Sequence, residues 1–243
     1  MSSRSLPASI RTLGYAGAVL LALLPISVLV VRAGAWQAGL ALYALTCLLS
    51  ALVLLVALVL LAWPRFRAST GAVLTRALLV LPGTLLLLSV LATRGDYPPI
   101  HDITTDLEDP PVFVHAPELR GSEANTLAIK PESLERQAQA YPDLETLHST
   151  LPPQQALERA ADIAEQLGWE LVYRDAPNGR LEAVATTAIM GFRDDIVIRV
   201  SPRVGGSDID LRSVSRVGVG DMGANAARIR AFLTHFTNEE HAP

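Results

Sequence analysis

FRDDIVIRVSPRVGGSDIDLRSVSRV, residues 192–217, is the stretch that decides the fold of this chain. It contains two strand-like runs, Ile196–Val200 and Ile209–Val217, on either side of the turn-forming residues PRVGGSD. A connection this short joins only antiparallel neighbours, because a parallel pair needs a crossover of a dozen or more residues. The stretch therefore predicts a β-hairpin.

The sequence around this hairpin extends it into a larger sheet. Two further strand signals, Trp169–Arg174 and Leu181–Ile189, precede it and are separated by the turn-formers DAPNGR and GFRDD. An amphipathic helix is predicted over Pro152–Leu167 and another over Gly223–Phe236, each with apolar residues at helical spacing. The order predicts an α+β domain: helix, four-stranded antiparallel meander, helix. Helices should cover one face of the sheet, and the residues do not indicate what covers the other.

Charge divides the chain into two parts. Residues 1–93 carry six arginines and no Asp, Glu or Lys, a formal charge of +6. All 24 acidic residues come later, against the remaining 14 of the 20 basic residues, which gives a formal charge of −10. Because an acidic surface repels phosphates, the second part is not expected to bind nucleic acid.

The first part contains three apolar segments, at about 12–31, 35–63 and 72–92. Each is long enough to cross a hydrocarbon core of about 30 Å, which takes roughly 20 helical residues. The third contains Arg76, which is close enough to one end to reach the head groups. Residues 1–93 are therefore predicted to be a membrane domain with three transmembrane helices. A cleaved signal peptide is the competing interpretation of the first segment, although its 20-residue run exceeds the usual 7–15 residues of a signal core.

The arginines predict the orientation of these helices. Arg4 and Arg11 precede the first segment, and Arg65, Arg67 and Arg76 surround the loop between the second and third. The excess of positive charge on cytoplasmic loops places the N-terminus in the cytoplasm and the C-terminal domain outside it. In a Gram-negative bacterium this describes a multi-pass inner-membrane protein with a periplasmic domain, and the lipid bilayer is its first expected partner.

Residues 94–243 are expected to form this extracytoplasmic domain, beginning with an extended, turn-rich leader over 94–130. Within the leader, HDITTDLEDPP places Asp102, Thr105 and Asp106 close together. Carboxylates beside a histidine can hold a divalent cation, yet their spacing matches no calcium loop, and local capping is the simpler explanation. No metal site is predicted.

The last predicted strand separates its side chains by alternation. Ile209 and Leu211 face one side, whereas Asp210, Arg212 and Arg216 face the other. Such an Asp/Arg face has two interpretations: cross-strand ion pairs on a solvated surface, or a surface that binds a polar or anionic ligand. The candidate ligand-binding residues are polar residues of the leader, of the GFRDD turn and of the last two strands: Asp102, Thr105, Asp106, Arg193, Asp194, Asp195, Arg199, Asp210, Arg212, Ser215 and Arg216.

The segment GVGDMG, Gly218–Gly223, has the GxGxxG spelling of a dinucleotide-binding turn. That turn requires a second parallel strand after its helix and an acidic residue about 20 positions further on. The 20 residues after Gly223 leave no room for such a strand, and Asp221 stands where it would cap the helix and compete with a phosphate. We therefore expect a tight turn with Asp221 as the cap, and neither a dinucleotide nor another cofactor.

Four segments together carry a family resemblance: DITTDLEDPPVF, AYPDL, MGFRDDIVIRV and IDLRSVSRVGVGDMGANAARIRAF. They resemble domain-of-unknown-function family 1499 over roughly His101–Phe236. The resemblance implies a bacterial protein that is often membrane-attached, and it implies no established activity. No catalytic residue can therefore be carried over, and the four segments are expected to form the framework of the domain.

Three functional hypotheses remain at this point. The first is a non-enzymatic, membrane-tethered envelope module that binds a small polar or lipid ligand or an envelope protein. The second is a hydrolase or transferase acting on an envelope lipid or glycan, with Asp102, Asp106 and Arg212 as its polar groups. The third is a structural assembly factor that acts through its transmembrane helices. No catalytic residue is assigned, because Ser213 and Ser215 have no histidine close in sequence.

Overall fold

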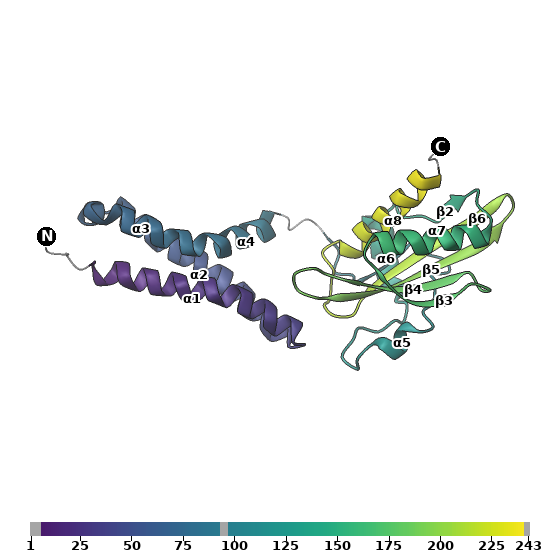
Figure 1. The fold of residues 1–243 in the computed structure, drawn as a ribbon, viewed down its shortest axis with the longest axis horizontal. Helices are drawn as coiled ribbons and strands as arrows, with labels where there is room; N and C mark the ends of the chain where they lie inside the picture. The colour runs from purple at the N-terminus through teal and green to yellow at the C-terminus, as the bar shows by residue number, and fades with distance from the viewer. Residues whose placement is uncertain (1–5, 93–96, 241–243) are drawn as a thin grey trace. The chain divides into compact units, whose positions relative to one another are not determined.

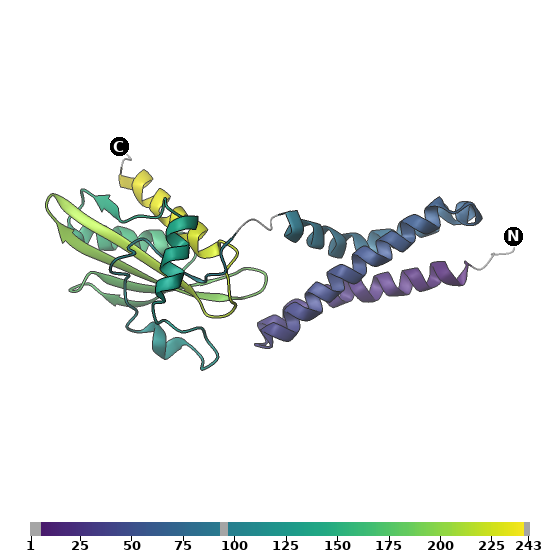
Figure 2. The same ribbon diagram turned by 180° about the vertical axis from the view of Figure 1, so that it is seen from behind.

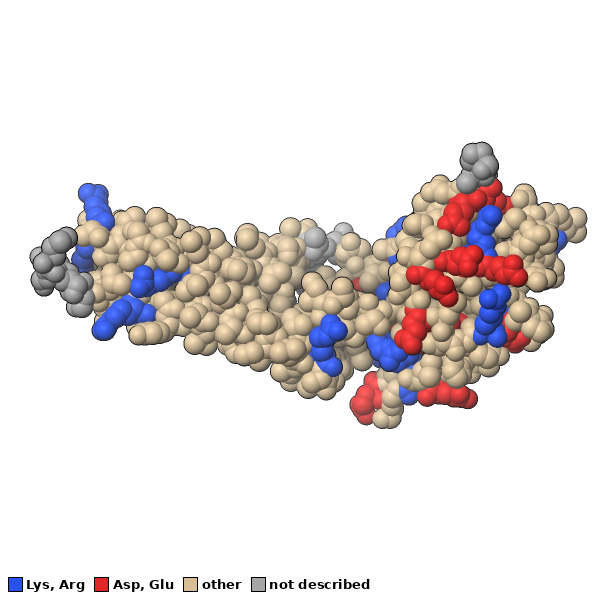
Figure 3. All heavy atoms as spheres, viewed as in Figure 1, with Lys and Arg blue, Asp and Glu red and all other residues tan. Residues whose placement is uncertain are grey.

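The computed structural model describes residues 6–92 and 97–240, which form two compact units (Figure 1). The first unit is built from the N-terminal helices and the second from a β-sheet with its own helices. Figure 2 shows both units from behind. Figure 3 shows the charge division in space: acidic side chains are scattered over the visible face of the sheet unit, and the helical unit has none.

The N-terminal unit contains three helical segments that are long and apolar enough to cross a membrane. The first two are α1 (Ala8–Arg32) and α2 (Trp36–Ala62). The third runs over Pro64–Ala92. Its pieces are η1 (Pro64–Ser69), α3 (Thr70–Ala77), η2 (Leu78–Val80) and α4 (Leu81–Ala92). The three predicted spans are thus present as helices, and the chain is a membrane protein.

The third segment is irregular for an identifiable reason. Pro82 has no N–H to donate to the carbonyl of Leu78, and the backbone tightens into the 3₁₀ turn η2 just before it. Gly83 then lies against α2, where a Cβ atom would be only 2.5 Å from the Ser50 hydroxyl oxygen. A small residue is therefore required for the close approach of α4 and α2.

The second unit is organised around an antiparallel sheet with the strand order β1-β6-β5-β4-β3. The four-stranded meander predicted from the sequence is confirmed. Its strands are β3 (Glu170–Asp175), β4 (Arg180–Thr186), β5 (Arg193–Arg203) and β6 (Gly206–Ser215). Two short strands that we did not predict, β1 (Asp102–Thr104) and β2 (Leu147–Ser149), pair with β6 along its other edge.

Helices α7 (Pro153–Gln166) and α8 (Ala224–Glu240) cover one face of the sheet, as predicted (Figure 1). Their apolar side chains and the inward residues of β4, β5 and β6 form the main core, in which Trp169 stacks on Phe232 with ring centroids 5.7 Å apart. Helix α6 (Pro131–Ala140) lies at the β1 edge. Its Gln137 side chain accepts a hydrogen bond from the Thr104 N–H and donates one to the Thr104 carbonyl, and so satisfies the outer edge of β1.

The leader covers the other face of the sheet. Phe113, Ala116 and Leu127 pack there against Val197 and Val214, and the short helix α5 (Ala116–Leu119) belongs to this cover. The interpretation of the Asp/Arg face as a solvated surface is therefore wrong, although the cross-strand ion pair that it included is present between Arg199 and Asp210. The reason is that the leader brings both apolar side chains and backbone polar groups onto the sheet, so the charged residues below it acquire partners other than water.

Candidate functional site

Arg212 is the most deeply buried of the arginines under the leader. Its guanidinium donates to both carboxylate oxygens of Asp102, at 2.9 and 2.7 Å, and also to the carbonyls of Pro111 and Leu127. The Phe113 ring lies 5.4 Å from the guanidinium carbon. Arg212 is 2 % exposed. It therefore joins β6 to β1 and to two further points of the leader.

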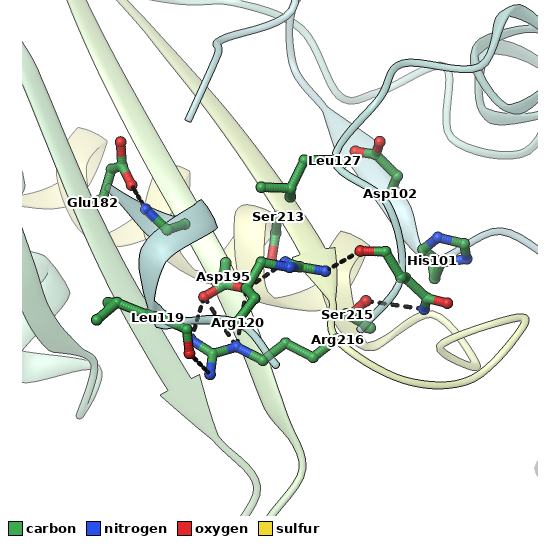
Figure 4. A network of polar contacts seen from close by, with 12 residues as sticks. His101, Asp102, Leu119, Arg120, Leu127, Glu182, Asp195, Ser213, Ser215 and Arg216 are labelled. Atoms are coloured by element: carbon green, nitrogen blue, oxygen red, sulfur yellow. Dashed lines mark hydrogen bonds and ion pairs between the residues drawn. The ribbon is translucent and has the colours of Figure 1, made fainter. Parts of the chain in front are cut away.

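A second cluster is centred on Asp195 of β5, which is fully buried (Figure 4). Arg216 donates to it through Nε and Nη2, and Arg120 of the leader reaches the same carboxylate. Both arginines also hold leader carbonyls, since Arg216 donates to Leu119 and Arg120 donates to Asn125. Burial lowers the pKa of Arg120, while the Asp195 charge opposes that shift. One carboxylate thus holds two guanidinium groups and two stretches of leader.

Glu182 of β4 makes a third connection to the leader. Its carboxylate accepts hydrogen bonds from the backbone N–H groups of Val114, His115 and Ala116, at 2.5 to 3.1 Å. Glu182 is 1 % exposed, so these amides replace the water that its charge has lost. The carboxylate serves as the local anchor of the chain entering α5.

The fourth cluster lies nearer to solvent and surrounds Arg199 of β5. Its guanidinium contacts the carboxylates of Asp106, Asp109 and Asp210 at 2.7, 2.8 and 3.1 Å. Burial would lower the pKa of Arg199, but the hydrogen bond and charge of Asp210, with those of Asp109, raise it above its ordinary value. Three carboxylates on one guanidinium leave an excess of negative charge at this point.

A cavity of about 470 Å³ opens beside Asp106. The Asp210 carboxylate accepts hydrogen bonds from the hydroxyls of Thr105 and Thr146, at 3.0 and 2.6 Å, and these two threonines belong to the wall. The lining residues come from the leader, from the end of α6 and from the segment leading into β2: Thr105, Asp106, Leu107, Ala138, Tyr141, Pro142, Leu144, Glu145, Thr146 and His148. The cavity therefore combines an aromatic and aliphatic wall with several exposed polar groups.

A separate polar cluster lies on the opposite face of the sheet, under α8. Asn225 accepts a hydrogen bond from the Ser213 hydroxyl at 2.7 Å and donates one to the Ser215 hydroxyl at 2.9 Å. Arg228 donates to the Asp194 carboxylate at 2.6 Å and to the Ser213 hydroxyl at 3.0 Å. The two serines, Asp194 and Asn225 are buried. These groups fix α8 to β5 and β6.

The predicted site residues therefore separate into three locations. Eight of them lie beneath or within the leader: Asp102, Thr105, Asp106, Asp195, Arg199, Asp210, Arg212 and Arg216. Asp194 and Ser215 face α8 instead, while Arg193 is exposed and lies 3.6 Å from Glu170. Alternation along the strands could have separated Asp194 from Asp195, because neighbouring residues point to opposite faces.

Sequence reasoning missed several partners of these residues. Arg120 and Thr146 lie in segments without regular periodicity, so no pattern marked them as partners of Asp195 and Asp210. Asn225 and Arg228 lie within one of the four family-like segments, three residues apart. This spacing places both side chains on one side of a helix. That spacing was the available signal for the cluster under α8.

The GVGDMG turn has the geometry predicted for a capped helix. Asp221 accepts hydrogen bonds from the N–H groups of Gly223 and Asn225, at 2.9 and 2.7 Å. Gly223 has φ +82°, and a Cβ atom there would lie 2.6 Å from the ring of Tyr97. Strand β6 runs antiparallel to β1, β2 and β5, so the turn does not belong to a βαβ unit with any of them.

Within residues 6–92 and 97–240, no group of three or more His, Cys, Asp or Glu side chains is arranged to hold a metal ion. In the clusters under the leader, the carboxylates are instead opposed by arginine or by backbone N–H groups. This pattern indicates that the clusters link the leader to the sheet and so stabilise the fold.

A comparison with protein families finds one match, to a model described as protein of unknown function (DUF1499), over residues 102–236. The chain belongs to the DUF1499 family. The DUF1499 match begins at β1 and ends within α8, so it includes all of the clusters described above, as the four family-like segments implied. A search of curated proteins finds no match.

Proposed function

We propose that the chain is a membrane-anchored binding module of the bacterial envelope that holds a small polar ligand in the cavity beside Asp106. The observation that carries the proposal is the cavity itself, an opening of about 470 Å³ next to a charged cluster. Binding sites for small molecules are typically concave, with an apolar wall and a few placed polar groups. The wall formed by Leu107, Tyr141 and Leu144, with Asp106 and Glu145 beside it, fits this description.

The other charged clusters are poor candidates for a binding surface. Arg212 and Asp195 are almost fully buried, and their charged atoms are engaged with opposite charges or with leader backbone. A ligand would have to displace the leader to reach them. Arg199, in contrast, lies next to the cavity, because it pairs with Asp106, which lines the wall. Another of its partners, Asp109, is largely exposed.

The chemistry of the cavity favours a ligand rich in hydrogen-bond donors. Ionised carboxylates only accept hydrogen bonds, and Asp106 and Glu145 present carboxylates at the wall. The Thr146 hydroxyl already donates to Asp210, so it too is left as an acceptor. The Thr105 hydroxyl donates to Asp210 and accepts from the Leu211 N–H, so it is already engaged on both counts. Hydroxyl or amine groups of a small envelope compound would match this set.

The orientation of the domain is part of the proposal. Arg4, Arg11, Arg65 and Arg67 lie on the sides of the spans that the positive-inside rule assigns to the cytoplasm, and this supports an extracytoplasmic sheet domain at the inner membrane. Alkaline phosphatase and green fluorescent protein fused after residue 243 provide the test. Active phosphatase with a dark fluorescent fusion is expected; the reverse pattern would overturn the orientation.

Native mass spectrometry of the full chain in detergent micelles tests the cavity. We expect a defined additional mass that is lost in Glu145→Gln and kept in Glu165→Gln, a matched change on the exposed side of α7. Equal loss in both variants, or no added mass after incubation with envelope extract, would contradict the proposed cavity. If the compound is recovered chemically altered after incubation with the protein, the domain is an enzyme and the binding proposal fails.

A further inference from the structure

The turn between β6 and α8 exposes apolar side chains at one end of the sheet. Val219 is 77 % exposed and Met222 is 56 % exposed. The same turn lies against the start of the leader, since Gly223 contacts the Tyr97 ring and the Val219 carbonyl lies 3.2 Å from His101 Nδ1. Single exposed apolar side chains are common on protein surfaces, so what distinguishes this pair is its position beside the start of the leader.

The conformation of the turn directs its charge inward and its apolar residues outward. The Asp221 carboxylate is engaged by the N–H groups of Gly223 and Asn225. Met222, next to it, has φ +53°, and among the described residues it is the only non-glycine residue with a positive φ. A methionine held in this unfavourable backbone region and left exposed indicates that its side chain has a use at the surface.

The covalent chain limits what this end of the domain can meet. Helix α4, the last part of the third membrane-capable segment, ends at Ala92, and Tyr97 packs against the turn. Five residue steps span at most about 17 Å. A helix that crosses a bilayer ends near the lipid head groups. A lipid surface is therefore within reach of the turn by chain length alone.

We propose that the turn 218–223 binds the lipid head-group region of the membrane, with Val219 and Met222 inserted among the lipids. Two apolar side chains alone would bind a bilayer weakly, but a short tether converts the contact into an intramolecular event with a high effective concentration. This surface is formed by residues other than those of the ligand cavity. It depends only on the membrane location of the N-terminal helices, so it can fail or succeed independently of the proposed ligand.

The experiment uses the full chain in phosphatidylcholine vesicles, with Cys47→Ala removing the single native cysteine. An environment-sensitive dye is attached at Val219→Cys, at Met222→Cys, or at Val204→Cys as the control. Val204 is 100 % exposed and lies in the turn between β5 and β6, at the opposite end of β6. Lipids with a nitroxide on the acyl chain then report contact with the bilayer by quenching.

We expect blue-shifted, nitroxide-quenched emission at positions 219 and 222, and solvent-like, unquenched emission at 204. In the Met222→Cys protein, Val219→Asp should remove the quenching, because a charge at the exposed position disfavours insertion without disturbing the core. Unquenched emission at 219 and 222 would overturn the proposal. A blue shift without nitroxide quenching would also overturn it, since that result indicates that the dye is buried against protein, in the same or another copy of this chain, and not among lipids.

Discussion

The guanidinium of Arg212 donates two hydrogen bonds, of 2.9 and 2.7 Å, to the carboxylate of Asp102, at the point where the leader joins the sheet. Asp102 pairs in register with Val214, so the side-chain contact and the backbone pairing of β1 with β6 reinforce one another. The same guanidinium holds the carbonyls of Pro111 and Leu127. One residue thus connects the leader to the sheet at three places through four hydrogen bonds.

Arg212→Ala should destabilise the sheet domain by about 3 to 5 kcal/mol, because it leaves the Asp102 charge and two carbonyls without their partner. Native-state hydrogen exchange of the β1 and β6 amides in the full chain measures the loss. The double variant Arg212→Met with Asp102→Leu should recover part of it, since no buried charge remains unpaired. If the double variant is less stable than Arg212→Ala, the pairing is not the source of the effect.

Asp195 and Arg120 form one ion pair, but we expect them to contribute unequally to holding the leader on the sheet. Asp195→Asn leaves two guanidinium groups facing each other without a carboxylate, whereas Arg120→Met leaves Asp195 paired with Arg216. Limited proteolysis with a glutamate-specific protease at Glu123, an exposed leader residue that both variants keep, reports release of the leader. We expect faster cleavage in Asp195→Asn than in Arg120→Met. The opposite order would indicate that the contact of Arg120 with the Asn125 carbonyl dominates.

Glu240 should make the end of α8 sensitive to acid. Burial would raise its pKa, but hydrogen bonds from Thr150, with one from Ser149, lower it below its ordinary value. A lowered pKa in the folded state adds stability above the ordinary glutamate pKa of about 4.3, and this stability is lost as the pH falls through the lowered value. The protection of the Thr150 amide from hydrogen exchange, corrected for intrinsic rates, should therefore fall between pH 6 and pH 3. Glu240→Gln should show weaker protection at pH 6 and no comparable change with pH.

The sequence was sufficient for the meander because β3 to β6 follow one another through short turns, and turn length alone requires antiparallel pairing. The three apolar helices could also be predicted from the sequence, since length and hydropathy identify them. Strands β1 and β2 were not, because each contains three residues and pairs with a strand more than 50 residues away along the chain. Their existence depends on tertiary contacts, such as the Gln137 amide against Thr104, that have no local signature.

The candidate site was only partly predictable for a related reason. Alternation correctly placed Asp210, Arg212 and Arg216 on the face opposite Ile209. It could not reveal that the leader covers this face, because Phe113 and Leu127 lie in irregular chain without periodicity. The same charged residues would form a solvated ladder without the leader, and with it they become internal cross-links.

The Asp221 cap gives a final test that separates structure from ligand binding at the GVGDMG turn. Asp221→Ala removes the acceptor for two backbone N–H groups and should cost about 0.5 to 2 kcal/mol, whereas Asp221→Asn keeps an acceptor oxygen and should cost less. Hydrogen exchange of the Gly223 and Asn225 amides measures both changes. If the turn held a phosphate instead, removing the carboxylate would relieve a repulsion, so NAD added to Asp221→Ala would restore protection of these amides. Because we interpret Asp221 as a structural cap on the Gly223 and Asn225 amides, we expect NAD to leave their exchange unchanged in the wild type and in both variants.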